Sequence, residues 1–135
     1  MSIDFGYDPV QRLEELLVSL TTTPPGELPM KVFEMEDGGE CPVWSLFEIE
    51  GKVSVVHFFM PEGGVFVRHK HDEMECLIPY SGRLVDLMPT NHETFGPNDV
   101  LRIVPGQTHR IEALEDTWGI AVAVPSSEGY PHADR

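Results

Sequence analysis

Basic residues are scarce in this sequence, which has 9 lysines and arginines against 23 aspartates and glutamates. The net charge at neutral pH is therefore -14. A surface of this sign repels the phosphate backbone of nucleic acids and the headgroups of anionic membranes. Because no cluster of Lys or Arg interrupts the pattern, we expect neither nucleic-acid binding nor membrane association.

Cysteines are few, and long apolar runs are missing. Cys41 and Cys76 are too few for a framework of disulfides. No apolar run approaches the roughly 20 residues that a membrane-spanning helix needs. The first residues include Asp4 and Asp8 and show no basic region followed by an apolar core, so we expect no secretory signal. The prediction is a cytoplasmic protein with two reduced thiols.

One helix is predicted near the N-terminus. Asp8 suits the N-cap, Pro9 the first helical position and Gln11 the capping-box position. The helix ends near Thr21, because residues 22–26 contain two prolines and a glycine. Apolar residues recur at helical spacing and form one stripe, made of Val10, Leu13, Leu16, Leu17 and Leu20. We expect this stripe to pack on the main domain or at a subunit contact.

From Met30 onward the sequence alternates with a period of two and is interrupted by turn residues. Many short strands with turn signals roughly every 8–12 residues are typical of an all-β sandwich, barrel or jelly roll. The expected organisation is an N-terminal arm and helix (1–29), one β-barrel domain (30–125) and a polar C-terminal tail (126–135). The predicted strands are residues 31–36, 43–50, 52–60, 65–71, 75–79, 83–88, 93–95, 100–104, 108–114 and 118–124.

A His-x-His pair, His69 and His71, is followed by Glu75 within a stretch bounded by glycines. On a strand, side chains two residues apart share a face about 6.6 Å apart, close enough for two imidazoles to bind one cation. In a straight strand Glu75 would lie about 13 Å beyond His71. Metal ligands lie about 2 Å from the ion, so a shared site requires the chain to reverse at residues 72–74.

His109 is a third candidate, on a predicted strand that follows a turn. It alternates with Ile111 and Ala113 on the face that we expect to be buried. Val65 and Val67 have the parity of the His-x-His pair, so we expect that pair to point inward as well. Three inward imidazoles and a carboxylate would be costly to bury without a shared partner, and a divalent cation is the simplest one. Nitrogen and oxygen ligands suit iron, manganese, zinc, nickel, cobalt or copper without distinguishing among them.

The spacing of these residues resembles the first conserved motif of the cupin superfamily. The match runs through Gly63, five residues, His69-x-His71, three residues, Glu75, six residues and Gly82. This spacing is complete and specific to the family.

A second cupin motif is resembled less closely by residues 98–113. The turn residues Pro105 and Gly106 and the ligand position His109 are kept. Three positions differ, because Asn98, Val104 and Ala113 stand where the motif has glycine, proline and asparagine. The resemblance covers about residues 43–124.

The resemblance implies a double-stranded β-helix within a jelly-roll barrel, with a divalent metal inside. The implied ligands are His69, His71, Glu75 and His109, and an octahedral ion would keep two positions for water, dioxygen or substrate. The leading hypothesis is a metal-dependent cupin acting on a small organic molecule. Among reactions we name a dioxygenase first and an isomerase or hydrolase next. Glu75 argues against the thiol dioxygenases of the superfamily, which use three histidines.

Two alternatives to an enzyme stay open, and so do the oligomeric state and the role of His57. The barrel could be a non-catalytic module that binds or senses a small ligand, or a structural barrel with vestigial histidines. A homodimer is expected from the resemblance and from the strand at 52–60, whose two apolar faces suggest that both are covered. His57 lies on that strand, so its direction is unreadable, and we interpret it as a packed histidine rather than a base near the metal.

Overall fold

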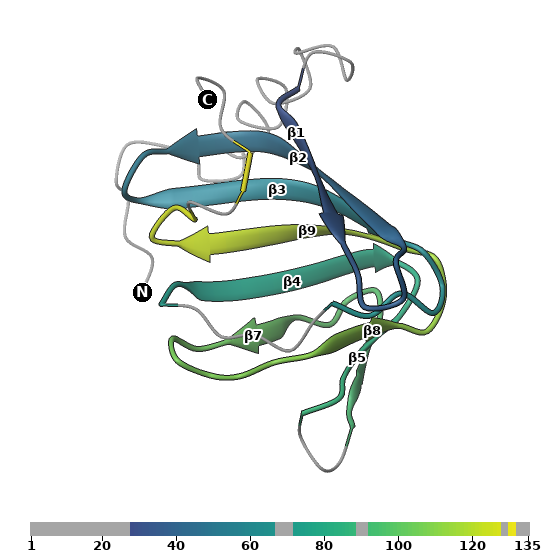
Figure 1. The fold of residues 1–135 in the computed structure, drawn as a ribbon. Coiled ribbons are helices and arrows are strands. Elements are labelled where there is room, and N and C mark those ends of the chain that lie inside the picture. Colours follow the sequence, from purple (N-terminus) through teal and green to yellow (C-terminus); the bar gives the residue numbers. More distant parts are fainter. Residues whose placement is uncertain (1–27, 67–71, 89–91, 128–129, 132–135) are drawn as a thin grey trace, which may run out of the picture.

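A computed structural model describes residues 28–66, 72–88, 92–127 and 130–131 of the chain (Figure 1). The helix expected over residues 8–21 lies outside the described residues, as do His69 and His71. Every element in the described part is a strand or a turn, which confirms the all-β prediction. The strands are β1 (Met30–Glu34), β2 (Glu40–Ile49), β3 (Val53–Met60), β4 (Met74–Ser81), β5 (Leu84–Asp86), β6 (Thr94–Phe95), β7 (Leu101–Ile103), β8 (Ile111–Ala113) and β9 (Thr117–Val124).

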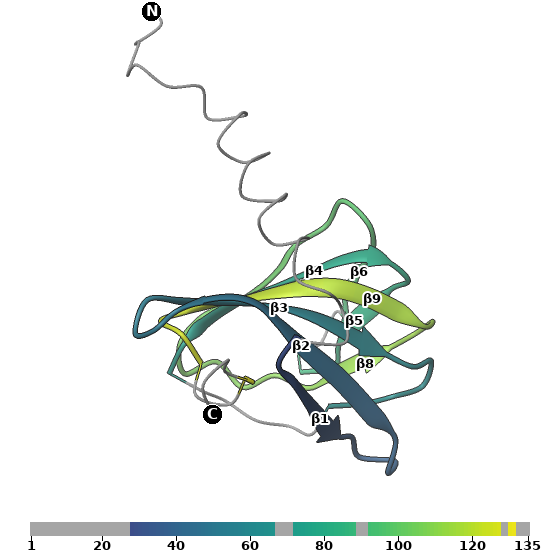
Figure 2. The ribbon, with the colours of Figure 1, turned by 90° about the horizontal axis from the view of Figure 1, so that it is seen from above.

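The strands form two antiparallel sheets. The large sheet has the order β1-β2-β3-β9-β4-β7, and the small sheet has the order β6-β5-β8. An antiparallel bridge between Val65 and Glu112 adds a further segment beside β8. Seen from above, β1 lies across from β4 and β9, because the large sheet curves (Figure 2). This arrangement is a double-stranded β-helix.

Residues of the central strands of the large sheet alternate between an inner, buried face and an outer face. Along β3, Val56, Phe58 and Met60 are buried, while His57 and Phe59 between them are partly exposed. β9 repeats this alternation, with small alanines on its inner side. Neighbouring residues of one strand therefore lie in different environments.

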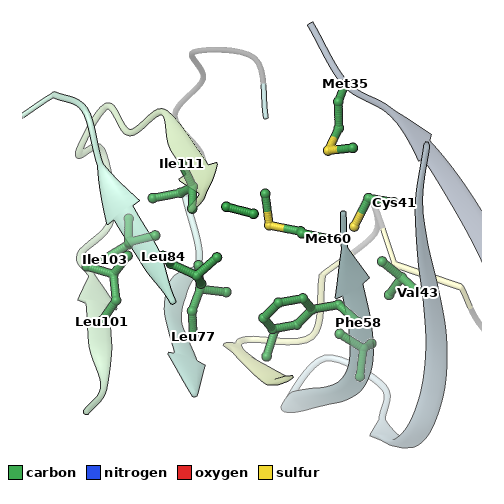
Figure 3. Close-up of a cluster of buried hydrophobic side chains, with 13 residues drawn as sticks. Met35, Cys41, Val43, Phe58, Met60, Leu77, Leu84, Leu101, Ile103 and Ile111 are labelled. Carbon is green, nitrogen blue, oxygen red and sulfur yellow. The ribbon is translucent and has the colours of Figure 1, made fainter. Parts of the chain in front are cut away.

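The core joins the two sheets. Figure 3 shows Met60 of β3 between Cys41 and Val43 of β2 on one side and Leu84 and Ile111 of the small sheet on the other. Cys41, Leu84, Ile103 and Ala113 have no exposed surface. Each large buried side chain contributes on the order of 1.5–3 kcal/mol through the removal of its apolar surface from water.

The glycines that bound the His-x-His stretch both adopt positive φ, 83° at Gly63 and 99° at Gly82. At Gly82 an added Cβ would also lie 2.4 Å from the carbonyl oxygen of Asp116. Only glycine fits that position, because both the backbone conformation and the close approach exclude a side chain. At Gly63 nothing lies within 4 Å of an added Cβ, so only the conformation favours glycine there.

Candidate metal and ligand site

The interior of the barrel contains a cavity of about 240 Å³. Most of its wall comes from strands of the large sheet, with Ile111 of β8 contributed by the small sheet. The side chains that line it are Phe33, Glu34, Val43, Val56, Phe58, Met60, Phe66, Glu75, Leu77, His109, Ile111, Ala121 and Tyr130.

Glu75 reaches the cavity from β4, on the same face of that strand as Leu77. The hydroxyl of Tyr130 donates a hydrogen bond of 2.5 Å to Oε2 of Glu75. Burial, and after it the negative charge of Glu75, raise the pKa of Tyr130 well above its usual value. The phenol therefore keeps its proton and acts as the donor to Glu75.

Tyr130 comes from the segment that follows β9, and that segment is tied to the barrel. The backbone nitrogen of Ser127 bonds to Oγ of Ser54 at 3.0 Å, and Oγ of Ser126 accepts from Gly51 at 2.7 Å. The ring of Tyr130 packs against the hydrophobic core. Tyr130 belongs to the expected polar tail, and no role was predicted for it. Its only signal was a lone aromatic residue after a cluster of serines.

His109 is buried, with 2% of its surface exposed, and lines the cavity together with Ile111. This confirms the expected inward face of the segment. Next to it, Arg110 points outward and makes a two-fold ion pair with Glu36, at 2.8 and 2.6 Å. The buried Asp86 accepts hydrogen bonds from the backbone nitrogens of Met88 and Arg110 through Oδ1. These contacts fix the backbone that carries His109.

Glu75 and His109 thus line one cavity, although they are distant in sequence. The other two candidate ligands, His69 and His71, lie outside the described residues. Among the residues that are described, no three His, Cys, Asp or Glu side chains form a group that could hold a metal ion. The four-ligand set therefore stays a prediction.

Glu75 does not continue the strand that begins at Val65. Val65 pairs with Glu112 beside the small sheet, whereas Glu75 pairs with Ile103 and Ala123 within the large sheet. The two segments thus lie in different sheets, and a bend at Asp72 and Glu73 precedes β4. The arrangement is compatible with the chain reversal that a shared site requires.

Of the neighbouring residues Val65 and Phe66, Phe66 lines the cavity, although Val65 was the residue expected to point inward. The nitrogen of Phe66 bonds to the carbonyl oxygen of Ile111, and its ring meets Phe33 edge-on at 6.0 Å.

His57 lies on the outer face of the large sheet, remote from the cavity wall. Its ring stacks on Tyr80 at 5.7 Å and lies 5.2 Å from the ring of Trp118. Nε2 of His57 and the hydroxyl of Tyr80 are 2.5 Å apart. Burial lowers the pKa of His57, so the neutral ring is favoured. The interpretation of His57 as a packed histidine agrees with this position.

Trp44 and Phe59 extend this outer aromatic cluster, which consists of Trp44, His57, Phe59, Tyr80 and Trp118. Tyr80 and Trp118 remain 51% and 36% exposed. The second apolar face of β3 is therefore only partly covered by the residues that the structure describes. The expected homodimer stays a prediction.

Comparison with known proteins supports the fold and not a closer assignment. Neither a family model nor a curated protein sequence matches the chain. A predicted oxalate decarboxylase from Thermotoga maritima is 23% identical, with a TM-score of 0.62 over 75% of this chain and 96% of that one. A cupin superfamily protein from Desulfitobacterium hafniense is 14% identical, with a TM-score of 0.57 over 62% and 76%. The polyketide cyclase RemF from Streptomyces resistomycificus is 14% identical, with a TM-score of 0.60 over 76% and 75%.

The chain therefore has the cupin fold, and the prediction drawn from the motif spacing is confirmed for the fold. Its structural neighbours include the polyketide cyclase and the predicted oxalate decarboxylase. Within the described residues, no helix is long and apolar enough to cross a membrane.

Proposed function

We propose that this protein is a metal-dependent cupin that acts on a small organic molecule inside the barrel. One observation carries the proposal: Glu75 and His109, predicted as ligands from distant parts of the sequence, line the same cavity. A carboxylate and an imidazole suit a divalent transition metal. His69 and His71 would complete the ligand set.

When bound, the metal would supply Lewis-acid or redox chemistry to a substrate held in the cavity. The residues of the chain provide the surroundings of that chemistry. Tyr130 holds one oxygen of Glu75 and so orients the carboxylate, while the mostly apolar side chains of the wall surround the reacting molecule. Among the reaction classes we infer a dioxygenase first and an isomerase next.

Metal analysis of protein produced without added metal tests the proposal. We expect about one divalent ion per chain in the unaltered protein. Glu75→Gln and His109→Ala should each retain at least tenfold less metal, as should the double variant of His69 and His71. His57→Ala is the matched control, because His57 lies outside the cavity and should leave the metal content unchanged. Circular dichroism verifies that each variant is folded.

A protein without stoichiometric metal, or a His109→Ala variant with unchanged metal content, would contradict the proposal. The reaction class needs its own measurement. Oxygen uptake by the iron-loaded protein with candidate substrates would support a dioxygenase and argue against a module that only binds or senses its ligand.

A further inference from the structure

Among the described residues, most of the side chains that line the cavity are apolar. Nine of its side chains are apolar and come from both sides of the barrel: Phe33, Val43, Val56, Phe58, Met60, Phe66, Leu77, Ile111 and Ala121. Such a wall cannot replace the hydrogen bonds that a polyhydroxylated or multiply charged molecule makes with water. It favours a ligand whose surface is mostly carbon.

The polar groups on the described wall carry negative charge or none. Glu34 and Glu75 are the acidic ones, and His109 and Tyr130 accompany them. No lysine or arginine belongs to the wall within the part of the chain that the structure describes. Without a bound cation, a ligand carboxylate would face repulsion from Glu75 in surroundings of low dielectric constant, where unit charges interact more strongly than in water.

The size and shape of the cavity restrict the ligand further. A dry apolar cavity of about 150 Å³ holds benzene, whereas drug-sized ligands occupy about 300–1,000 Å³. The volume of about 240 Å³ therefore corresponds to one substituted ring. Phe33 and Phe66 meet edge-on in this wall, and aromatic side chains stabilise planar rings at such distances.

We propose that the cavity binds an uncharged, single-ring aromatic compound that carries one hydroxyl, carbonyl or amide group. The ring contacts the phenylalanines and aliphatic side chains, and the polar substituent faces Glu75 and His109. The inference deepens the proposed function, since it names the substrate class for the same cavity, but the apolar wall that carries it does not depend on the metal.

Benzamide and benzoate test this proposal, because they share one shape and differ in charge. Calorimetry uses the full-length protein both as purified and after EDTA treatment, because a bound cation would itself attract benzoate. The EDTA-treated protein isolates the contribution of the wall, and there we expect benzamide to bind at least tenfold more tightly than benzoate. The Thermotoga neighbour makes oxalate a third probe, for which we expect no binding.

Two adjacent residues of β9 supply matched variants. Ala121 lines the cavity and Val122 lies on the outer face of the same strand. Ala121→Leu adds bulk inside the cavity and should weaken benzamide binding at least tenfold, while Val122→Leu should leave it unchanged. Methyl NMR of the unaltered protein gives a test that does not depend on how a variant folds. Benzamide should shift the methyl signals of Leu77 and Ala121 and not that of Val122.

Benzoate binding to the EDTA-treated protein as tightly as benzamide, or benzamide shifts confined to the outer face, would overturn the proposal. Failure of this proposal is distinguishable from failure of the proposed function. Protein that holds metal but does not bind benzamide contradicts only the substrate class. Protein that binds benzamide in the cavity but no metal contradicts only the metal-dependent chemistry.

Discussion

The inner face of the large sheet places Tyr130 against Glu75, whereas the outer face places Tyr80 against His57. Both hydrogen bonds are 2.5 Å long, but their surroundings differ. Tyr80 is 51% exposed, so water can replace its partner. Tyr130 packs against the core and lines the cavity, where far less water can do so.

Two similar hydrogen-bonded pairs therefore differ in the free energy that is lost when each is broken. An exposed polar pair contributes little when broken, because both groups are hydrated afterwards. Polar groups that line a buried cavity lose much of their hydration, which costs free energy. Such groups are common at functional sites. The comparison therefore predicts that breaking the inner pair costs more free energy than breaking the outer one.

The largest expected difference between the two faces is in the reactivity of their cysteines. Cys41 is fully buried, and burial raises its pKa to about 12. Cys76 lies between Glu75 and Leu77 on the opposite, outer side of β4 and is partly exposed. The thiolate is the reactive form, and at pH 8 a thiol with that pKa is roughly one part in ten thousand ionised.

We expect iodoacetamide at pH 8 to modify Cys76 and to modify Cys41 roughly a thousandfold more slowly, as measured by peptide mass spectrometry. A Cys76→Ser variant isolates the slow reaction and controls for loss of structure after the first modification. Similar rates at both thiols would mean that the inner face opens readily to solvent, and the contrast between the faces would fail.

Phe58 and Phe59 are adjacent residues of β3, so truncating each one compares the packing on the two faces. Phe58 is 4% exposed and lines the cavity, and Phe59 lies outside against Trp118 at 4.7 Å. Truncation of a buried phenylalanine to alanine costs about 3–5 kcal/mol, because apolar contacts are lost and a void remains. We expect Phe58→Ala to cost about 3 kcal/mol and Phe59→Ala about 1 kcal/mol in urea-induced unfolding.

Equal costs for the two substitutions would show that the outer face is buried as completely as the inner one. That result would support the predicted homodimer, and the cost of Phe59→Ala should then depend on protein concentration. Independence of concentration together with a small cost would indicate that the outer cluster faces solvent.

Much of the fold was predictable from local patterns. The alternation of apolar residues and the turn residues located each strand of the described barrel, because both signals depend on neighbours in sequence. His109 was also assigned correctly to the inner face, since Ile111 and Ala113 mark that face without ambiguity.

Other features depended on tertiary packing and were not predictable. On β3 both faces are apolar, so nothing local could place His57 outside. The inward turn of Phe66 follows from its pairing with Ile111 in another element. Tyr130 enters the cavity because Ser126 and Ser127 are bonded to Gly51 and Ser54, far away in sequence.

Tyr130 and Tyr80 give the comparison with the smallest expected change in the free energy of unfolding. Tyr130→Phe keeps the ring in the core and removes one donor to Glu75, whereas Tyr80→Phe removes an exposed hydroxyl from His57. Hydrogen bonds to charged groups contribute about 1.5–3 kcal/mol, and exposed neutral ones contribute less. We expect Tyr130→Phe to lower the free energy of unfolding by about 1–2 kcal/mol and Tyr80→Phe by less than about 0.5 kcal/mol. Equal effects would mean that Glu75 is hydrated in the folded protein, and Tyr130 would then not be the residue that orients it.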